Sequence, residues 1–113
     1  MSTIFTKIIN KEIPADIVYE DDEILAFNDI QPQAPIHVLV IPKIEIETLN
    51  ELEEKHQLLT GKIIHRASLI AKELGLADDG YRLVINCNKN GGQAVYHLHC
   101  HLLGGRAMQW PPG

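Results

Sequence analysis

The fold is decided by the stretch His97-Leu98-His99-Cys100-His101-Leu102-Leu103. Histidines alternate here with apolar residues, and successive side chains of a β-strand point to opposite faces. A strand therefore places all three histidines on one face and the leucines and the cysteine between them on the other. Three imidazoles on one face repel one another when charged and are costly to bury without partners. A purely structural role is therefore the weaker interpretation.

The segments before this stretch predict an antiparallel sheet. The histidine strand covers residues 95–103, and residues 88–92, Asn-Lys-Asn-Gly-Gly, form a turn sequence that tolerates positive φ. The apolar run 81–86 precedes that turn, so we expect a hairpin. Three further strands are indicated by β-branched and aromatic runs that end at acidic or proline-containing turns. They cover residues 16–20, 23–29 and 36–41.

Two helices complete the predicted fold. Apolar residues recur at helical spacing in residues 3–11, which Pro14 stops, and in residues 52–74, which Gly75 follows as a C-cap. We expect the long helix to cover the face that carries the leucines, which leaves the other face open for function or for a partner. The prediction is an α+β fold, a five-stranded antiparallel sheet with one long and one short helix, forming one domain over residues 1–113.

Composition excludes several classes of protein. The 113 residues carry 15 acidic and 10 basic side chains, a formal net charge of −5, which disfavours binding to nucleic-acid polymers and to anionic membranes. We find no apolar run near the roughly 20 residues that span a bilayer and no signal peptide, so we expect a cytoplasmic protein. Cys87 and Cys100 make no disulfide framework, which agrees with that compartment. A chain this small buries more surface by dimerising.

Three chemistries can use the histidine cluster. Zinc takes three histidines in catalytic sites, but no fourth ligand is obviously placed, so zinc is the weaker interpretation. A Cys–His nucleophile needs Cys100 beside an imidazole, whereas alternation sends this thiol to the opposite face. The third option is histidine itself as the nucleophile, because an unperturbed pKa of about 6.5 suits proton handling near neutral pH. Phosphoryl centres suit that chemistry.

Other residues converge on the same face. By strand parity, His37 points away from its apolar neighbours and toward the open face. Asn86 either reaches the same face by parity or is an ordinary strand-end asparagine that opens the turn. The glycine-rich turn 90–94 offers backbone N–H groups to an anion. Asp29, at a strand end, either accepts two ribose hydroxyls or caps a turn. A pocket for the rest of a ligand is available from residues that otherwise belong to the core, namely Phe5, Ile8, Phe27, Ile30 and Leu39.

The stretch 97–103 resembles the signature of the histidine triad family, in which three histidines alternate with apolar residues and two apolar residues follow. The resemblance covers nearly the whole chain, because segments 4–9, 29–35, 40–43 and 110–113 resemble the HINT-type, nucleotide-binding branch of purine nucleoside phosphoramidases. It implies a homodimer in which two five-stranded sheets join into one of ten strands. It also implies that no metal or other cofactor is required, and that the ligands are purine nucleoside 5′-phosphoramidates or AMP and GMP.

The resemblance further implies roles for individual residues. His99 would attack the α-phosphorus of an adenosine or guanosine 5′-phosphoramidate, while the main-chain carbonyl of His97 holds its other ring nitrogen. His101 would bind phosphate oxygens, with His37 and His97 supporting proton movement. The remaining expected contacts are Asn86, Gly92 and Ala94 to the phosphate, Asp29 to the ribose, Phe5, Ile8, Ile13, Phe27, Ile30 and Leu39 around the base, and Trp110 toward the site of the neighbouring subunit.

Ala94 departs from the pattern of the family, which usually has serine just before Val-Tyr-His. A hydroxyl that contacts the phosphate and the scissile bridge is therefore missing, whereas the backbone N–H is retained. Two alternatives stay open at this point. One is a dinucleoside polyphosphate hydrolase of a sister branch, and the other is a nucleotide- or zinc-binding interaction protein without turnover.

Overall fold

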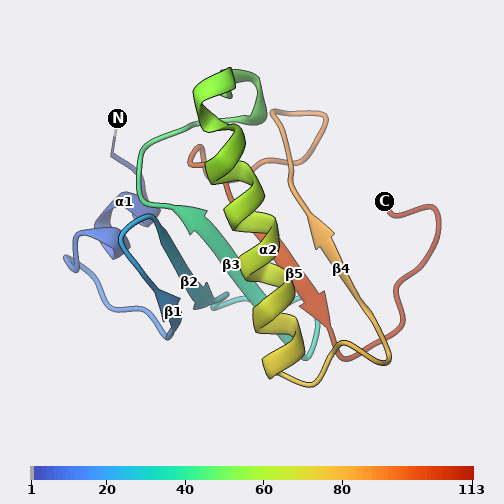
Figure 1. The fold of residues 1–113 in the computed structure, drawn as a ribbon. Coiled ribbons are helices and arrows are strands. Elements are labelled where there is room, and N and C mark those ends of the chain that lie inside the picture. Colours follow the sequence, from blue (N-terminus) through green and yellow to red (C-terminus); the bar gives the residue numbers. More distant parts are fainter. Residues whose placement is uncertain (1) are drawn as a thin grey trace.

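The sheet has the strand order β1-β2-β3-β5-β4, and all neighbouring strands are antiparallel (Figure 1). The computed structural model describes residues 2–113. The strands are β1 (Ile17–Glu20), β2 (Ile24–Asn28), β3 (Ile36–Pro42), β4 (Tyr81–Val84) and β5 (Cys100–Gly104). The predicted five-stranded antiparallel sheet is confirmed, with β1 and β4 at its two edges.

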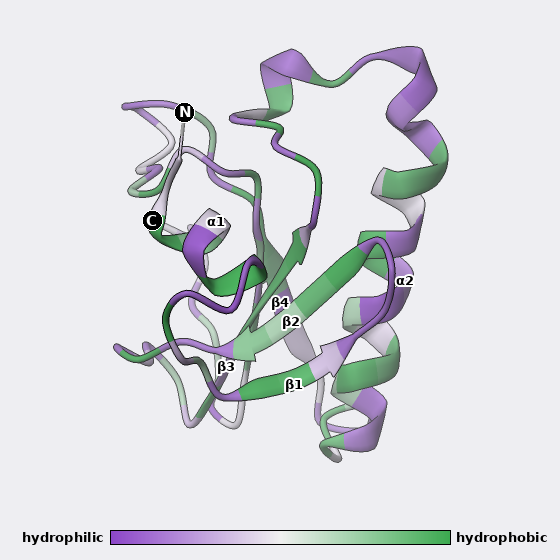
Figure 2. Ribbon diagram, turned by 90° about the vertical axis from the view of Figure 1, so that its left-hand side faces the viewer, coloured by the Kyte–Doolittle hydropathy of each residue, from purple (hydrophilic) through white to green (hydrophobic). Residues whose placement is uncertain are grey.

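The helices α1 (Ile4–Ile9) and α2 (Gln57–Glu73) lie on opposite faces of this sheet (Figure 2). Side chains of β3 alternate between them: Val38 and Val40 belong to the apolar cluster under α2, whereas Leu39 and Ile41 belong to the cluster that contains the buried face of α1. The sheet is thus the middle layer, and both of its faces are packed near the centre. The face expected to be open is partly covered by the short helix.

The helices are shorter than their sequence patterns predict. The α1 helix stops at Ile9, before Pro14, because Lys11 takes a positive φ of 62° that a helix does not allow. The first turn predicted for the long helix, over residues 52–74, is instead the 3-10 turn η2 (Glu54–His56), and a further 3-10 turn, η1 (Leu49–Glu51), precedes the predicted range. Gly75, with a φ of 78°, follows the end of α2 as expected. None of the helices within residues 2–113 has the length and hydropathy needed to cross a bilayer.

The connection between β4 and β5 is much longer than the predicted hairpin turn. The sequence predicts strands over residues 81–86 and 95–103. The predicted end of the first strand and the predicted start of the second are wrong, because β4 stops at Val84 and β5 begins only at Cys100. The buried Gln93 amide holds the intervening loop: its Oε1 accepts from the Asn88 N–H at 2.9 Å, and its Nε2 donates to the Glu47 carbonyl at 2.7 Å. Residues of this loop therefore bond to other segments instead of extending the β4–β5 ladder.

Candidate active site

The three histidines keep the predicted alternation although two of them precede β5. Leu98, Cys100 and Leu102 all belong to the apolar cluster under α2, so the histidines between them face the α1 side. Burial raises the pKa of the Cys100 thiol to about 11. A thiolate nucleophile is disfavoured on both counts, as predicted.

His99 is the ring whose geometry suits a nucleophile. Its Nδ1 lies 2.7 Å from the carbonyl oxygen of His97, and only a protonated Nδ1 bonds to a carbonyl. In the neutral ring the lone pair is therefore on Nε2, which has no hydrogen-bond partner among residues 2–113. Phe5 packs edge-on against this ring, with centroids 5.1 Å apart. The contacts fix both the tautomer and the orientation of the ring.

His97 supports the orientation of the His99 ring. Its side chain is 1% exposed, and its Nε2 donates to the Pro42 carbonyl at 2.8 Å. The ring is thus bound to β3 while the carbonyl of the same residue orients His99. His97 acts as a positioning residue for His99 in this geometry.

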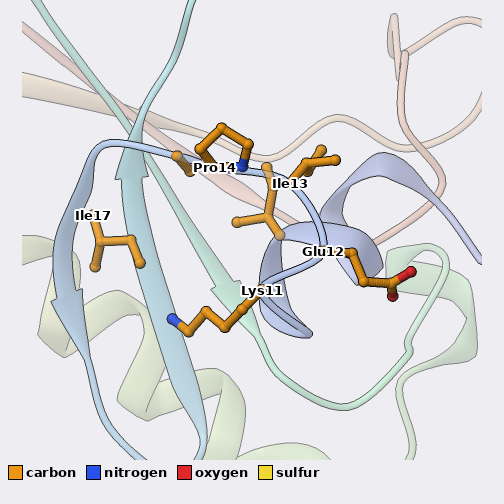
Figure 3. Close-up of a pocket in the computed structure, with 7 residues that line it drawn as sticks. Lys11, Glu12, Ile13, Pro14 and Ile17 are labelled. Atoms are coloured by element: carbon orange, nitrogen blue, oxygen red, sulfur yellow. The ribbon is translucent and has the colours of Figure 1, made fainter.

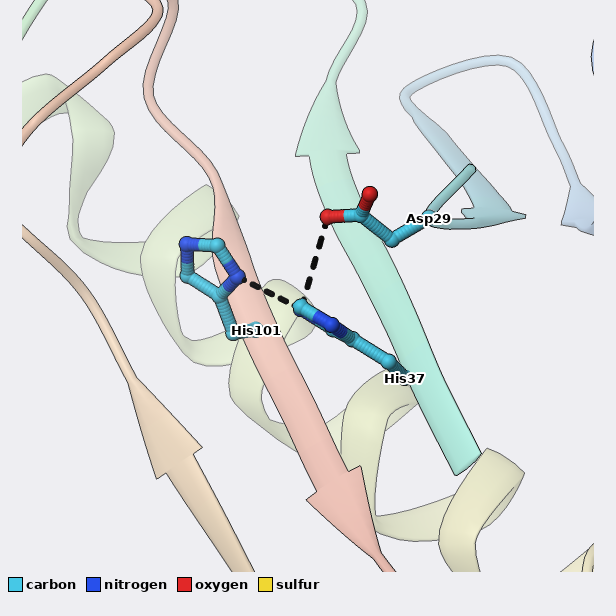
Figure 4. A group of neighbouring side chains, drawn as sticks. All are labelled: Asp29, His37 and His101. Atoms are coloured by element: carbon cyan, nitrogen blue, oxygen red, sulfur yellow. Dashed lines mark hydrogen bonds and ion pairs between the residues drawn. The ribbon is translucent and has the colours of Figure 1, made fainter. Parts of the chain in front are cut away.

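His37 and His101 form a directed pair across β3 and β5. The Gln33 N–H donates to His37 Nδ1 at 3.0 Å, so in the neutral ring the proton of His37 is on Nε2. That Nε2 lies 2.9 Å from His101 Nδ1, which must then accept (Figure 4). The neutral His101 ring consequently carries its proton on Nε2. His99 and His101, with ring centroids 4.9 Å apart, offer a lone pair and an N–H respectively at Nε2.

Asp29 follows β2 and contacts this pair. One carboxylate oxygen lies 3.5 Å from His37 Nε2, and the other accepts from the Gln31 N–H at 2.8 Å (Figure 4). The turn-capping role considered for Asp29 is therefore present. Its expected role as the ribose ligand remains a prediction.

All four rings favour the neutral state. Burial lowers the pKa of His37, His97 and His99 below the usual 6.5. Burial, together with the nearby His99 and His37 rings, lowers the pKa of His101 to about 4. The cluster is therefore uncharged at neutral pH, and the tautomers assigned from its hydrogen bonds describe its chemistry.

The apolar residues expected around the base separate into three groups. Phe5, Ile8, Phe27 and Leu39 form one buried cluster beneath the histidines. Ile13 packs at the margin of that cluster, whereas Ile30 is 89% exposed and lies outside it. A cavity of about 360 Å³ opens beside the cluster (Figure 3). It is lined by Ile8, Lys11, Glu12, Ile13, Pro14, Ala15 and Ile17, and none of the four histidines borders it.

The glycine-rich loop is exposed at Gly91 and Gly92, but the Gly92 N–H donates to the Lys89 carbonyl at 3.0 Å within the turn. Asn86 donates from its side chain to the Gly91 carbonyl at 2.6 Å, so this amide is engaged within the loop. Gly92 has a φ of 75°, and a Cβ there would lie 4.0 Å from the Asn86 amide nitrogen. Ala94 is exposed. The contacts of these residues with a phosphate remain predictions.

Trp110 lies beside β4, an edge strand of the sheet. Its side chain is 83% exposed, and the Arg82 guanidinium lies 6.0 Å from the ring centroid. The same arginine donates to the Gln109 carbonyl at 2.9 Å. The tail is thereby fixed beside the edge strand, and its reach to a second subunit remains a prediction.

Sequence reasoning missed several positioning groups. The carbonyl of Pro42 and the N–H of Gln33 are main-chain groups, which most residue types supply equally. The carbonyl of His97, by contrast, holds His99 Nδ1 as the family resemblance implied. Gln93 was also missed, because its partners, the Asn88 N–H and the carbonyls of Glu47 and Val95, are main-chain groups that the sequence does not single out. Arg106, which donates to the Gln33 carbonyl, had no signal in the sequence.

The family model of the HIT (histidine triad) domain matches residues 10–108. The chain belongs to the HIT family. A solved HIT family hydrolase from Legionella pneumophila Philadelphia 1 has a TM-score of 0.97 and 54% sequence identity, over 99% of this chain and 100% of that one. The chain is thus a HIT family hydrolase in fold and family.

Two curated relatives carry more specific names. The purine nucleoside phosphoramidase of Escherichia coli strain K12 is 56% identical over 106 residues, which cover 94% of this chain and 89% of the relative. A 14 kDa zinc-binding protein of Brassica juncea is 54% identical over 113 residues, which cover 98% of this chain and 99% of the relative. The two names point to different uses of similar HIT domains.

Proposed function

We propose that this HIT family hydrolase cleaves the P–N bond of adenosine or guanosine 5′-phosphoramidates through a nucleotidyl-histidine at His99. The observation that carries the proposal is the bond from His99 Nδ1 to the His97 carbonyl, which leaves the lone pair of the neutral ring on Nε2. Burial keeps that ring neutral and therefore nucleophilic. The phosphoramidase name of the Escherichia coli relative supports the substrate class.

In the first step, His99 Nε2 forms a bond to the α-phosphorus while the P–N bond breaks. The electron pair of that bond stays with the amine nitrogen, which takes up one proton from solvent. His101 donates a hydrogen bond from Nε2–H to the phosphoryl oxygens and stabilises the charge that develops on them. The modified His99 ring keeps its Nδ1–H on the His97 carbonyl.

In the second step, a water oxygen forms a bond to the phosphorus and the P–His99 bond breaks. The electron pair returns to His99 Nε2, and the water releases one proton. The two steps consume one water and no net proton, and they yield an amine and a nucleoside monophosphate. Asp29 near His37 stabilises any positive charge that passes through the His37–His101 pair.

The remaining expected contacts are part of the same proposal. The loop at Gly92 and Ala94 binds the phosphate with Asn86, and the Gly92 N–H would have to leave the Lys89 carbonyl to take part. Asp29 takes the ribose hydroxyls. The purine is enclosed by Phe5, Ile8, Ile13, Phe27, Ile30 and Leu39. Two chains join at their β4 edges, because β4 has a neighbour on one side only and the exposed Trp110 lies beside it. A measured mass of 12.7 kDa in dilute solution, that of one chain, would contradict the homodimer. Cytoplasmic location stays a prediction.

Zinc binding is the second candidate. Asp29, His37 and His101 offer ligand atoms within 4.8 Å of one another, which supplies the carboxylate that the sequence did not place, and a relative is named a zinc-binding protein. However, the Gln33 N–H on His37 Nδ1 leaves a proton on Nε2, the atom that would have to ligate. A metal at this position therefore requires that hydrogen bond to break, and the arrangement does not fit the ion as it stands.

The decisive experiment incubates the protein with adenosine 5′-phosphoramidate, with and without a chelator, and follows release of AMP. We expect turnover that survives exhaustive chelation and acid-labile AMP attached at His99. Activity that chelation abolishes and zinc restores would establish the metal site instead. Comparable turnover of diadenosine polyphosphates would favour the sister-branch hydrolase.

A further inference from the structure

We propose that Arg106 and the main chain of Gln33 together fix the tautomer of His37, so that His101 presents an N–H rather than a lone pair to an anionic ligand. The inference deepens the proposed function and rests on it for the identity of that ligand. The tautomer itself is a property of the protein without a ligand. It is read from three hydrogen-bonded links.

The first link joins the segment after β5 to the loop before β3. Arg106 donates from Nε at 3.1 Å and from Nη2 at 2.9 Å, both to the carbonyl oxygen of Gln33. The two segments are also pressed together beside this bond, because a Cβ at Gly105 would lie 2.9 Å from Pro35 Cβ. Two donors on one oxygen hold a peptide more rigidly than a single contact does.

The second link is the N–H of the same Gln33. It donates at 3.0 Å to His37 Nδ1, which must be unprotonated to accept. The N–H and the carbonyl of Gln33 flank one Cα, so restraining the carbonyl restrains the direction of the N–H. The Gln33 side chain takes no part, since its amide donates to the Gln31 carbonyl instead.

The third link is the hydrogen bond between His37 and His101, through which the tautomer of His37 determines that of His101. His37 Nε2–H donates to His101 Nδ1 at 2.9 Å, and the single proton of a neutral His101 is then on Nε2. In the opposite tautomer, His101 would direct a lone pair at the phosphate and repel it. An exposed arginine thus acts as a positioning residue for a histidine that it does not touch.

The test measures the tautomer of His37 and the affinity for a ligand in separate experiments. With ¹⁵N-labelled histidine, long-range ¹H–¹⁵N correlation spectra show which ring nitrogen of His37 is protonated. Titration with AMP and with adenosine measures the phosphate contribution to binding, because the two probes differ only in the phosphate. The variants are Arg106→Ala and Gln33→Pro, which remove the clamp and the N–H respectively. Thermal melting establishes that each is folded.

Two further variants serve as controls. Gln33→Ala removes the side chain but keeps both main-chain groups, so the His37 tautomer is expected to persist. Arg66→Lys changes an arginine of α2 that stacks on Tyr19, at 3.7 Å from its ring centroid, and leaves the histidines untouched. It controls for the general effect of replacing an arginine.

We expect His37 to be protonated at Nε2 alone in the unmodified protein, and to populate the Nδ1–H form in Arg106→Ala and Gln33→Pro. The Kd for AMP should rise roughly 3- to 10-fold in both variants, the size of one hydrogen bond, while the Kd for adenosine changes less than about 2-fold. Weaker AMP binding in Arg106→Ala with the tautomer unchanged would mean a simple charge effect and overturn the inference. A tautomer shift without any AMP binding would support the inference and count against the proposed function.

Discussion

The two faces of the β3–β5 strand pair are built on different principles. Toward α2, Val38, Val40 and Leu102 are fully buried and apolar, and they contact the small or branched residues of the helix. Toward α1, His37 and His101 stand beside Leu39, and each ring is linked to another residue by a directed hydrogen bond. The difference teaches that one face supplies stability through packing, whereas the other supplies reactivity through hydrogen-bond direction. Substitutions on the α2 face should therefore lower stability, whereas substitutions on the α1 face should lower activity.

The largest expected effect is on the α1 face. His99→Ala should lower the hydrolysis of adenosine 5′-phosphoramidate at least about 1,000-fold, because no other ring offers its lone pair to the phosphorus. AMP affinity should change little, since the other phosphate and ribose contacts remain. Steady-state kinetics and AMP titration measure the two quantities, with the exposed His65→Ala as the matched control. Residual turnover near that of the unmodified protein would remove His99 from its role.

Leu102→Ala tests the α2 face. Deleting this fully buried side chain should lower the free energy of unfolding by about 2–5 kcal/mol, through lost burial and a cavity. The rate per folded molecule should stay the same, because the side chain points away from the histidines. Urea denaturation and active-site-normalised kinetics measure both. Leu103→Ala, one residue along and only half-buried, should cost less. An unchanged stability in Leu102→Ala together with a lower rate would break the comparison between the faces.

Acid should affect reactivity and stability in the same direction. Because the pKa of His99 lies below 6.5, more than half of this ring is neutral at pH 6.5, and activity should fall about tenfold per pH unit below its pKa. The unfolded chain binds more protons wherever a folded histidine has the lower pKa. The free energy of unfolding should therefore decrease as pH falls from 6.5, with the His101 contribution extending to about 4. Activity that keeps rising on acidification, with no acidic limb, would contradict the neutral nucleophile.

Ala94→Ser adds the hydroxyl that the family pattern usually has. A hydrogen bond to the scissile bridge should raise kcat for poor leaving groups by roughly 5- to 30-fold, and less for good ones. Nucleotide affinity should stay similar, because the backbone N–H is present in both forms. A series of phosphoramidates with amines of graded basicity measures the effect. If kcat depends on the basicity of the leaving amine in the same way in both proteins, the side chain at position 94 does not contact the scissile bridge.

Removing residues 110–113 should have the smallest effect. The tail is held beside β4 by Arg82, and we expect its removal to change the preference among leaving groups by a few-fold. Dimer mass should persist. Mass measurement and competition between two substrates test these points, and a monomeric truncated protein would place the tail in the dimer interface instead.

Alternation of side chains could be predicted from sequence because it is local to an extended chain. It correctly assigned Leu98, Cys100 and Leu102 to the core and His37 to the histidine face. The start of β5 could not be predicted, because it depends on the bond from the Leu98 N–H to the Ile46 carbonyl, 2.6 Å long, and on the amide of Gln93. Pairings between distant segments leave no periodic pattern.

Much of the finer geometry of the site could not be predicted from the sequence either. The sequence predicts that Ile30 lines an apolar pocket, yet the turn from Asp29 to Gln31 places its side chain in solvent. The bond from His99 to the His97 carbonyl was expected from the family resemblance, whereas the other two bonds that determine histidine tautomers come from the main chain of Gln33 and Pro42. Nearly any residue provides the same N–H or carbonyl, so residue identity carries little information about them.

Those main-chain bonds have a consequence for protein design. Two carbonyls direct His97 and His99, while one N–H directs His37, so neighbouring rings acquire opposite polarity from main-chain groups. Transplanting the four histidines onto another antiparallel sheet would reproduce their positions but leave each ring free to exchange tautomers. A working transplant has to include the loop before β3 and the irregular approach to β5.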